Sequence, residues 1–100
     1  MRASWSLAAG YETAGQFPRA ARSYFRVLVA AVASEDKVAM ADISENMIRV
    51  QLAMNDRGKA LNYLNGAMRF AQELGDAARF KRLKDLSQAL GRLTPNRSGE

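Results

Sequence analysis

Apolar side chains recur along this chain at the three- and four-residue intervals of an amphipathic helix. The pattern is most regular between residues 40 and 54, where it defines one buried stripe. Glycine, asparagine and aspartate interrupt the pattern several times. The sequence therefore predicts an all-α protein of five helices with short connections, and we interpret the methionines of the stripe as core residues. The stripe consists of Met40, Ile43, Met47, Val50 and Met54.

Three residues suit the end of a helix. Gly15, Asn55 and Gly75 each follow a run of apolar positions at helical spacing. Glycine and asparagine tolerate the left-handed backbone conformation that closes many helices. We therefore expect the first helix to cover about residues 3–14 and two later helices to end near Asn55 and Gly75.

Other residues suit the start or the interior of a helix. Ser34 offers a capping hydroxyl for the third helix, and the acids Glu35 and Asp36 suit the positive end of its dipole. Asp76 offers an N-cap for the fifth helix. Gly10 lies inside the first helix, where glycine costs about 1 kcal/mol relative to alanine. We expect a neighbouring backbone to approach Gly10 closely and to compensate for this cost.

The stretch from residue 7 to residue 24 indicates two short amphipathic helices that meet at a glycine. Within it a leucine, a small residue, an aromatic, a glycine, an aromatic, an alanine and an aromatic keep fixed separations. This pattern resembles the tetratricopeptide repeat (TPR), a helical hairpin that recurs along a chain. The residues that support the resemblance are Leu7, Ala8, Tyr11, Gly15, Phe17, Ala20 and Tyr24.

A second and weaker copy follows forty positions later. It keeps the leucine-like, turn, alanine and leucine positions, whereas Ile48 replaces a small residue and Gln51 and Arg57 replace aromatics. Because forty exceeds the commonest unit, the resemblance is to the variety with long helices. The second copy comprises Met47, Ile48, Gln51, Asn55, Arg57, Ala60, Leu64 and Ala67, and a third, half copy begins at Leu86, Ser87 and Leu90.

The resemblance implies an α-solenoid, in which antiparallel helical hairpins stack side by side. One domain over residues 1–93 would hold about two and a half TPR-like repeats. Repeat one would cover about 3–33, repeat two about 36–74 and a terminal helix about 77–93, and the polar tail over 94–100 would be disordered. A closed helical bundle is the structural rival. The forty-residue echo favours the stack, because each hairpin then buries its apolar face against its neighbours.

Composition leaves few means of catalysis. The 100 residues include no cysteine and no histidine, so the chain has no thiol nucleophile and no histidine to activate a serine. Asp42 and Glu45 share a helix face, but two carboxylates do not form a metal cage. We therefore expect no enzyme, no cofactor and no metal. No apolar run approaches the roughly 18 residues of a bilayer span, and we expect the protein in the cytoplasm.

The net charge of +5 is unevenly distributed. Basic residues dominate the chain between Arg79 and Arg92. Two interpretations are open: this segment is the solvated outer face of a terminal helix, or it attracts an acidic partner or a phosphate backbone. Phe80 is the only aromatic among these basic residues, which makes nucleic acid the less favoured partner.

The TPR resemblance also implies a binding surface, because the first helix of each hairpin lines the concave face in this family. The same positions can be found on the first, third and fifth predicted helices. For Trp5 a second interpretation is packing against Tyr11 or a neighbouring helix. The implied partner-binding residues are Trp5, Ala9, Glu12, Thr13, Asp42, Glu45, Asn46, Arg49, Lys81, Lys84, Gln88 and Arg92.

The predicted function is a noncatalytic scaffold that binds a peptide or helix of a partner protein in a concave, TPR-like groove. The alternatives are a small basic nucleic-acid-binding helical domain and a self-association segment of a larger regulatory protein. Because repeat arrays need covered ends, we expect upstream repeats or a second copy of the chain to cover the N-terminal hairpin. The sequence does not identify the partner.

Overall fold

The structure, a computed structural model, describes the backbone of residues 2–93 and the side chains of residues 4–91, and it is all-helical over this range. The predicted disordered tail over 94–100 lies outside the described residues. No helix within residues 2–93 combines the length and hydropathy that crossing a bilayer requires. The five helices are α1 (Arg2–Thr13), α2 (Phe17–Ala33), α3 (Lys37–Ala53), α4 (Arg57–Leu74) and α5 (Ala77–Leu93).

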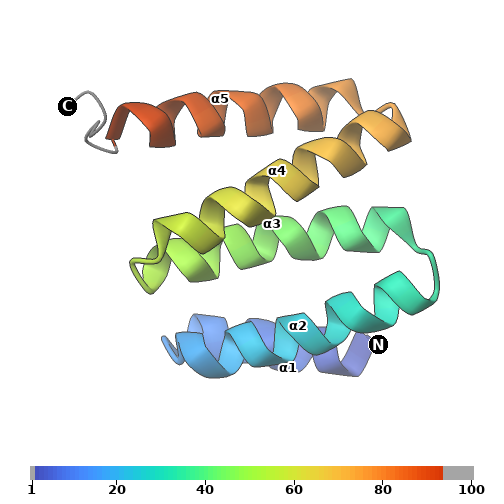
Figure 1. Cartoon of the computed structure of the whole chain (residues 1–100). Helices are drawn as coiled ribbons and strands as arrows, with labels where there is room; N and C mark the ends of the chain where they lie inside the picture. The colour runs from blue at the N-terminus through green and yellow to red at the C-terminus, as the bar shows by residue number, and fades with distance from the viewer. Residues whose placement is uncertain (1, 94–100) are drawn as a thin grey trace.

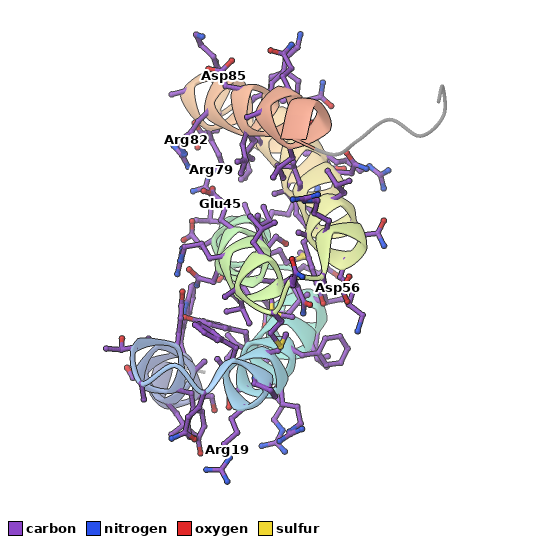
Figure 2. The ribbon with its side chains drawn as sticks, turned by 90° about the vertical axis from the view of Figure 1, so that its left-hand side faces the viewer. Arg19, Glu45, Asp56, Arg79, Arg82 and Asp85 are labelled. Carbon is purple, nitrogen blue, oxygen red and sulfur yellow. The ribbon has the colours of Figure 1, made fainter. Side chains whose placement is uncertain are left out.

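Successive helices run back and forth in three levels (Figure 1). The pair α1 and α2 lies at the bottom, α3 and α4 lie in the middle, and α5 lies at the top. In each pair the first helix lies on the left and the second on the right in the view of Figure 2. Each helix packs against the next one along the chain. This follows from the connections, which are too short to let a helix pass its neighbour.

All four connections close in the same way. One residue in each has a positive φ, namely Gly15 (78°), Glu35 (56°), Asn55 (62°) and Gly75 (70°). The N–H of this residue donates to the carbonyl three residues earlier, and the next N–H donates to the carbonyl five residues earlier. These bonds satisfy carbonyls that the helix end leaves free. The expected roles of Gly15, Asn55 and Gly75 are confirmed, and the regular spacing repeats each hairpin after forty residues.

Aspartate caps three of the helices. The Oδ1 atoms of Asp36, Asp56 and Asp76 each accept a hydrogen bond from the backbone N–H three residues later, at 3.0 Å. The predicted cap at Asp76 is therefore confirmed. The predicted capping role of Ser34 is wrong, because its hydroxyl donates to the carbonyl of Ala30 at 2.9 Å. Ser34 lies one residue too early: it closes α2, and the left-handed residue separates it from α3.

The core has two parts that meet on α3. One cluster joins α1, α2 and α3, and the other joins α3, α4 and α5. Met47 belongs to the first and its neighbour Ile48 to the second, so α3 presents apolar side chains in two directions. The stripe predicted on α3 packs in the first cluster, which confirms its methionines as core residues. The buried members of the second cluster are Ile48, Ala60, Leu64, Ala67, Leu83 and Leu90.

The expectation for Gly10 is wrong. A Cβ atom built at this position meets nothing within 4 Å, so no neighbouring backbone requires a glycine there. Gly10 lies on the exposed side of α1. Its cost to the helix therefore has no packing compensation among the described residues.

Candidate functional site

Two adjoining cavities lie along the side of the molecule formed by α1, α3 and α5. Their volumes are about 550 and 370 Å³, and Trp5, Asn46 and Arg49 line both of them. The first cavity is also lined by Ala9, Glu12, Thr13, Phe17 and Tyr24, and the second by Asp42, Glu45, Arg79 and Arg82. Side chains from α1, α3 and α5, together with Phe17 and Tyr24 of α2, thus form one continuous surface.

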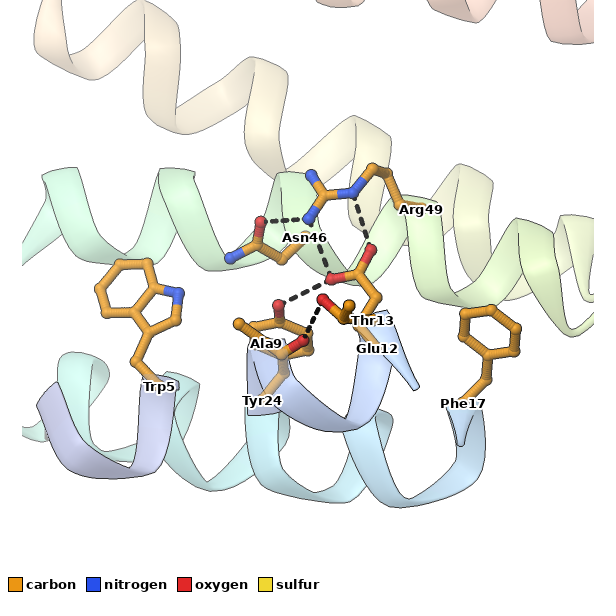
Figure 3. A pocket seen from close by; sticks show the side chains of 8 residues that line it. All are labelled: Trp5, Ala9, Glu12, Thr13, Phe17, Tyr24, Asn46 and Arg49. Carbon is orange, nitrogen blue, oxygen red and sulfur yellow. Dashed lines mark hydrogen bonds and ion pairs between the residues drawn. The ribbon is translucent and has the colours of Figure 1, made fainter. Parts of the chain in front are cut away.

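The first cavity has aromatic walls (Figure 3). Trp5 and Phe17 are partly buried against the first core cluster, so each ring has one side in the core and another toward the cavity. The interpretation of Trp5 as a packed residue and its expected place on the binding surface are therefore compatible. Thr13 closes part of the rim, with its hydroxyl donating to the carbonyl of Ala9 at 3.0 Å.

A hydrogen-bond network crosses this cavity and joins α1 to α3. Arg49 donates to both carboxylate oxygens of Glu12, at 2.9 and 3.0 Å. The same guanidinium donates to Oδ1 of Asn46 at 2.9 Å, and the buried Tyr24 donates its hydroxyl to Glu12 at 2.8 Å. Figure 3 shows the bonds from Arg49 and Tyr24 meeting at the Glu12 carboxylate, and Asn46 bonded to the same guanidinium. The two-point contact between Arg49 and Glu12 fixes the relative position of the two helices as well as neutralising the charges.

These contacts shift two pKa values in opposite directions. The hydrogen bonds from Arg49 lower the pKa of Glu12 below its ordinary value of 4.5; burial partly opposes the shift and the Tyr24 hydroxyl adds to it. Burial and, after it, the Glu12 carboxylate together raise the pKa of Tyr24 to about 12, because removing the proton would place two negative charges together. At neutral pH the site therefore holds an ionised Glu12 and a protonated Tyr24.

Arg79 organises the second cavity. It is only 15% exposed and donates to Asp42 at 2.7 Å and to Asp76 at 3.2 Å. Its Nη1 lies 3.0 Å from Glu45 Oε2 but is not aligned for a hydrogen bond, so charge attraction alone acts between these two atoms. The backbone N–H of Arg79, followed by its side chain, lowers the pKa of Asp76. One arginine on α5 therefore connects α3, α5 and the connection before α5.

Arg82 adds a second link between α3 and α5. Its Nη2 lies 2.8 and 3.0 Å from the two carboxylate oxygens of Glu45. Figure 2 shows Glu45, Arg79 and Arg82 pointing toward one another from the facing sides of α3 and α5. Glu45 thus lies between two guanidinium groups.

The arginine contacts share one sequence separation. Glu12 and Arg49, Asp42 and Arg79, and Glu45 and Arg82 are each 37 residues apart. This interval is the forty-residue hairpin spacing shortened by about one helical turn, so each pair joins the first helix of one hairpin to the corresponding helix of the next. The sequence reasoning missed Phe17, Tyr24, Arg79 and Arg82. A search for opposite charges at one recurring interval would have found the two arginines.

The structure brings together most of the residues that the TPR resemblance implied. All eight of those on α1 and α3 line the two cavities. Lys81, Lys84 and Gln88 are exposed on α5 and line neither cavity. The positions on α5 that the TPR resemblance implied are therefore not the ones that face α3. Arg79 and Arg82 face α3 instead, through their contacts with Asp42 and Glu45. The side chain of Arg92 lies outside the described residues.

The site offers binding chemistry in the form of aromatic surface, an amide and paired charges. No group of three or more acidic, histidine or cysteine side chains suited to a metal ion occurs among residues with described side chains. Comparison of the chain with models of known protein families, with curated proteins and with solved structures found no match.

Proposed function

We propose that this protein is a noncatalytic, TPR-like scaffold that binds a peptide or helix of a partner protein. In this proposal α1–α2 and α3–α4 are two stacked hairpins, α5 is the first helix of a third, and the partner lies along α1, α3 and α5. The observation that supports it is the adjoining pair of cavities, which these three helices line together with Phe17 and Tyr24 of α2. A surface of this length suits a polypeptide segment better than a compact small molecule.

The lining residues indicate how such a segment would be recognised. Trp5 and Phe17 offer apolar surface for one or two side chains of the partner. Asn46 and the outer edge of Arg49, whose side chain is 56% exposed, offer polar groups beside that surface. The acidic groups are already engaged by arginine, so shape and apolar contact would contribute more than net charge.

Selection of peptides from a display library on the 100-residue chain tests this function. We expect the selected peptides to lose at least about tenfold in affinity for the Trp5→Ala and Asn46→Ala variants, which corresponds to about 1.4 kcal/mol of binding free energy. Lys84→Ala is the matched control on the outside of α5. Circular dichroism would establish that each variant keeps its helical content.

Two outcomes would contradict the proposal. One is a set of selected peptides whose affinity is unchanged in Trp5→Ala and Asn46→Ala. The other is a larger loss with Lys84→Ala than with either cavity variant, which would place binding on the exposed side of α5. The nucleic-acid alternative is weaker than the sequence indicated, because Arg79, Lys81 and Arg82 of the basic cluster all have carboxylate partners.

A further inference from the structure

A third cavity, of about 470 Å³, lies between α2 and α4 and shares no residue with the two cavities described above. Its floor is formed by α3, through the buried side chains of Met47 and Gln51. Aromatic residues contribute from both walls. The lining residues from α2 are Ala21, Arg22, Phe25 and Arg26, and those from α4 are Lys59 and Tyr63.

The charges of this third cavity are all positive. Arg22, Arg26 and Lys59 line it, and no acidic residue does. None of the ion pairs among the described side chains involves any of these three residues. The first two cavities differ in this respect, because their arginines are neutralised by carboxylates of the same chain. Three unneutralised cations around one cavity favour an anionic occupant.

A buried amide marks the floor of the same cavity. Gln51 is only 4% exposed, and its Oε1 atom has no hydrogen-bond partner among the described residues. A buried amide oxygen without a partner costs free energy that a donor from a bound molecule would recover. Half a turn of the amide exchanges its oxygen and nitrogen, so Gln51 can present either an acceptor or a donor to an occupant.

An apolar stripe extends from this cavity along the exposed side of α2. Phe25, Val29 and Val32 follow one another at helical spacing and are 52%, 52% and 55% exposed. Large apolar side chains exposed in a row are typical of surfaces that bind a partner. Phe25 belongs to both the cavity and the stripe, so the two features form one surface that combines positive charge with aliphatic groups.

We propose that the surface formed by the third cavity and the α2 stripe binds an acidic, amphipathic peptide segment of a partner protein. Carboxylates of the segment pair with Arg22, Arg26 and Lys59, and its apolar side chains cover Phe25 and the two valines. An N–H group of the segment meets the Gln51 amide. A nucleic acid would neutralise the cations but has no aliphatic groups for the valines, and a second copy of this chain carries a net charge of +5.

Peptide display on the 100-residue chain, followed by fluorescence anisotropy with the selected peptides, tests this inference. We expect a class of peptides in which acidic residues flank apolar ones. Their affinity should fall at least about tenfold in the Arg22→Gln, Arg26→Gln, Lys59→Gln triple variant and should fall as salt rises. The matched control is Arg57→Gln, Arg69→Gln, Lys84→Gln, which removes three exposed charges outside the described cavities and should change affinity less than about twofold.

Gln51→Leu separates a binding role from a structural one. This variant removes a buried polar group that lacks a partner, so we expect the melting temperature of the free protein to stay the same or to rise. The affinity for the acidic peptides should fall several-fold nevertheless. A fall in melting temperature with no change in affinity would show that Gln51 serves the fold alone and would overturn its part in the inference.

Three other outcomes would overturn the inference as a whole. The first is a selection without acidic apolar peptides, or affinities that the triple variant leaves unchanged. The second is tighter binding of a single-stranded RNA than of the peptides, with the same dependence on Arg22, Arg26 and Lys59. The third is a dimer in sedimentation that Val29→Ser disrupts. Trp5→Ala should leave acidic-peptide binding intact, so this inference and the proposed function can fail independently.

Discussion

At the scale of the single residue, the helix connections differ in how well their side chains suit a left-handed backbone. Gly15 and Gly75 adopt positive φ without a steric penalty, and Asn55 tolerates it. Glu35 adopts the same conformation with a φ of 56° although it has a Cβ atom and a long side chain. The hydrogen bonds that close α2 are the same as in the other connections. The geometry of the connection therefore imposes the conformation, and Glu35 pays a local steric cost.

Glu35→Gly should stabilise the protein by about 1 kcal/mol. The substitution removes a left-handed penalty of about 1–2 kcal/mol, and the greater freedom of glycine in the unfolded chain offsets part of this gain. Thermal denaturation should show a melting temperature higher by about 5 °C. Gly75→Ala is the opposite control and should lower the melting temperature; an unchanged or lower value for Glu35→Gly would contradict the prediction.

The raised pKa of Tyr24 predicts a loss of stability at alkaline pH. Its pKa is raised to about 12, whereas the tyrosines of the unfolded chain titrate near 10. Between these values the unfolded state releases the proton first, so the contribution of Tyr24 to stability is complete below pH 10 and is lost as pH rises to 12. The pKa of Tyr24 is raised because its hydroxyl is buried beside the Glu12 carboxylate, which Arg49 contacts in turn.

Urea denaturation of wild type and Tyr24→Phe across this pH range measures the loss. The free energy of unfolding of the wild type should fall more steeply than that of the variant between pH 10 and 12, by up to about 2 kcal/mol. Taking the difference between the two proteins removes the titration of the lysines. Parallel curves would show that the Tyr24 hydroxyl has an ordinary pKa in the folded state.

At the scale of the element, pairs of carboxylate and guanidinium groups join helices that do not follow one another directly in the chain. The pairs Glu12 with Arg49 and Glu45 with Arg82 connect α1 to α3 and α3 to α5. Arg79 differs from the other arginines because its side chain is mostly buried and lies close to three carboxylates. Removing the Arg79 side chain would leave three carboxylates close together without a positive charge between them. Arg49 and Arg82 are more than half exposed, so water can replace part of their contacts.

Arg79→Met should therefore destabilise the protein by roughly 1–3 kcal/mol, because a buried charged donor of several hydrogen bonds is lost. A double-mutant cycle on Arg49→Gln and Glu12→Gln should give a smaller coupling energy, about 0.5–1 kcal/mol, since solvent screens this exposed pair. Chemical denaturation measures both quantities. A cost for Arg79→Met below the coupling energy of the exposed pair would show that the network around Arg79 does not stabilise the fold.

At the scale of the whole molecule, stability should vary along the chain. Each helix packs against its neighbours in sequence, and the two core clusters meet at α3 and at Tyr63 of α4. α3 has apolar partners in two directions, whereas α1 and α5 contribute to one cluster each. A terminal helix that packs against one cluster alone can open without exposing the distant core.

Native-state hydrogen exchange should therefore find the slowest amides in α3 and faster exchange in α1 and α5. Measurement at several low urea concentrations distinguishes local opening from global unfolding, because only the latter depends strongly on denaturant. Equal protection of all five helices would contradict the prediction and would indicate that the molecule unfolds as a single cooperative unit.

Particular residues show which features of the fold could be predicted from the sequence. Gly15, Asn55 and Gly75 identify helix ends because the left-handed conformation restricts the residue type. The Met40 to Met54 stripe identifies a helix because its three- and four-residue spacing places the apolar side chains along one side of a helix. The capping role predicted for Ser34 was wrong because a hydroxyl can bond to a carbonyl at the end of one helix as well as to an N–H at the start of the next. Gly10 misled because the sequence does not show what, if anything, lies beside it.

By itself the sequence determined the helices, most of their ends and the forty-residue spacing between hairpins. These properties depend on contacts within a few residues along the chain. Only the tertiary structure decided that Arg79 and Arg82 face Asp42 and Glu45, that Tyr24 reaches Glu12, and that Lys81 and Lys84 point away. The physical reason is that such contacts depend on how far each helix is rotated about its axis against the next, and packing of the whole core sets that rotation.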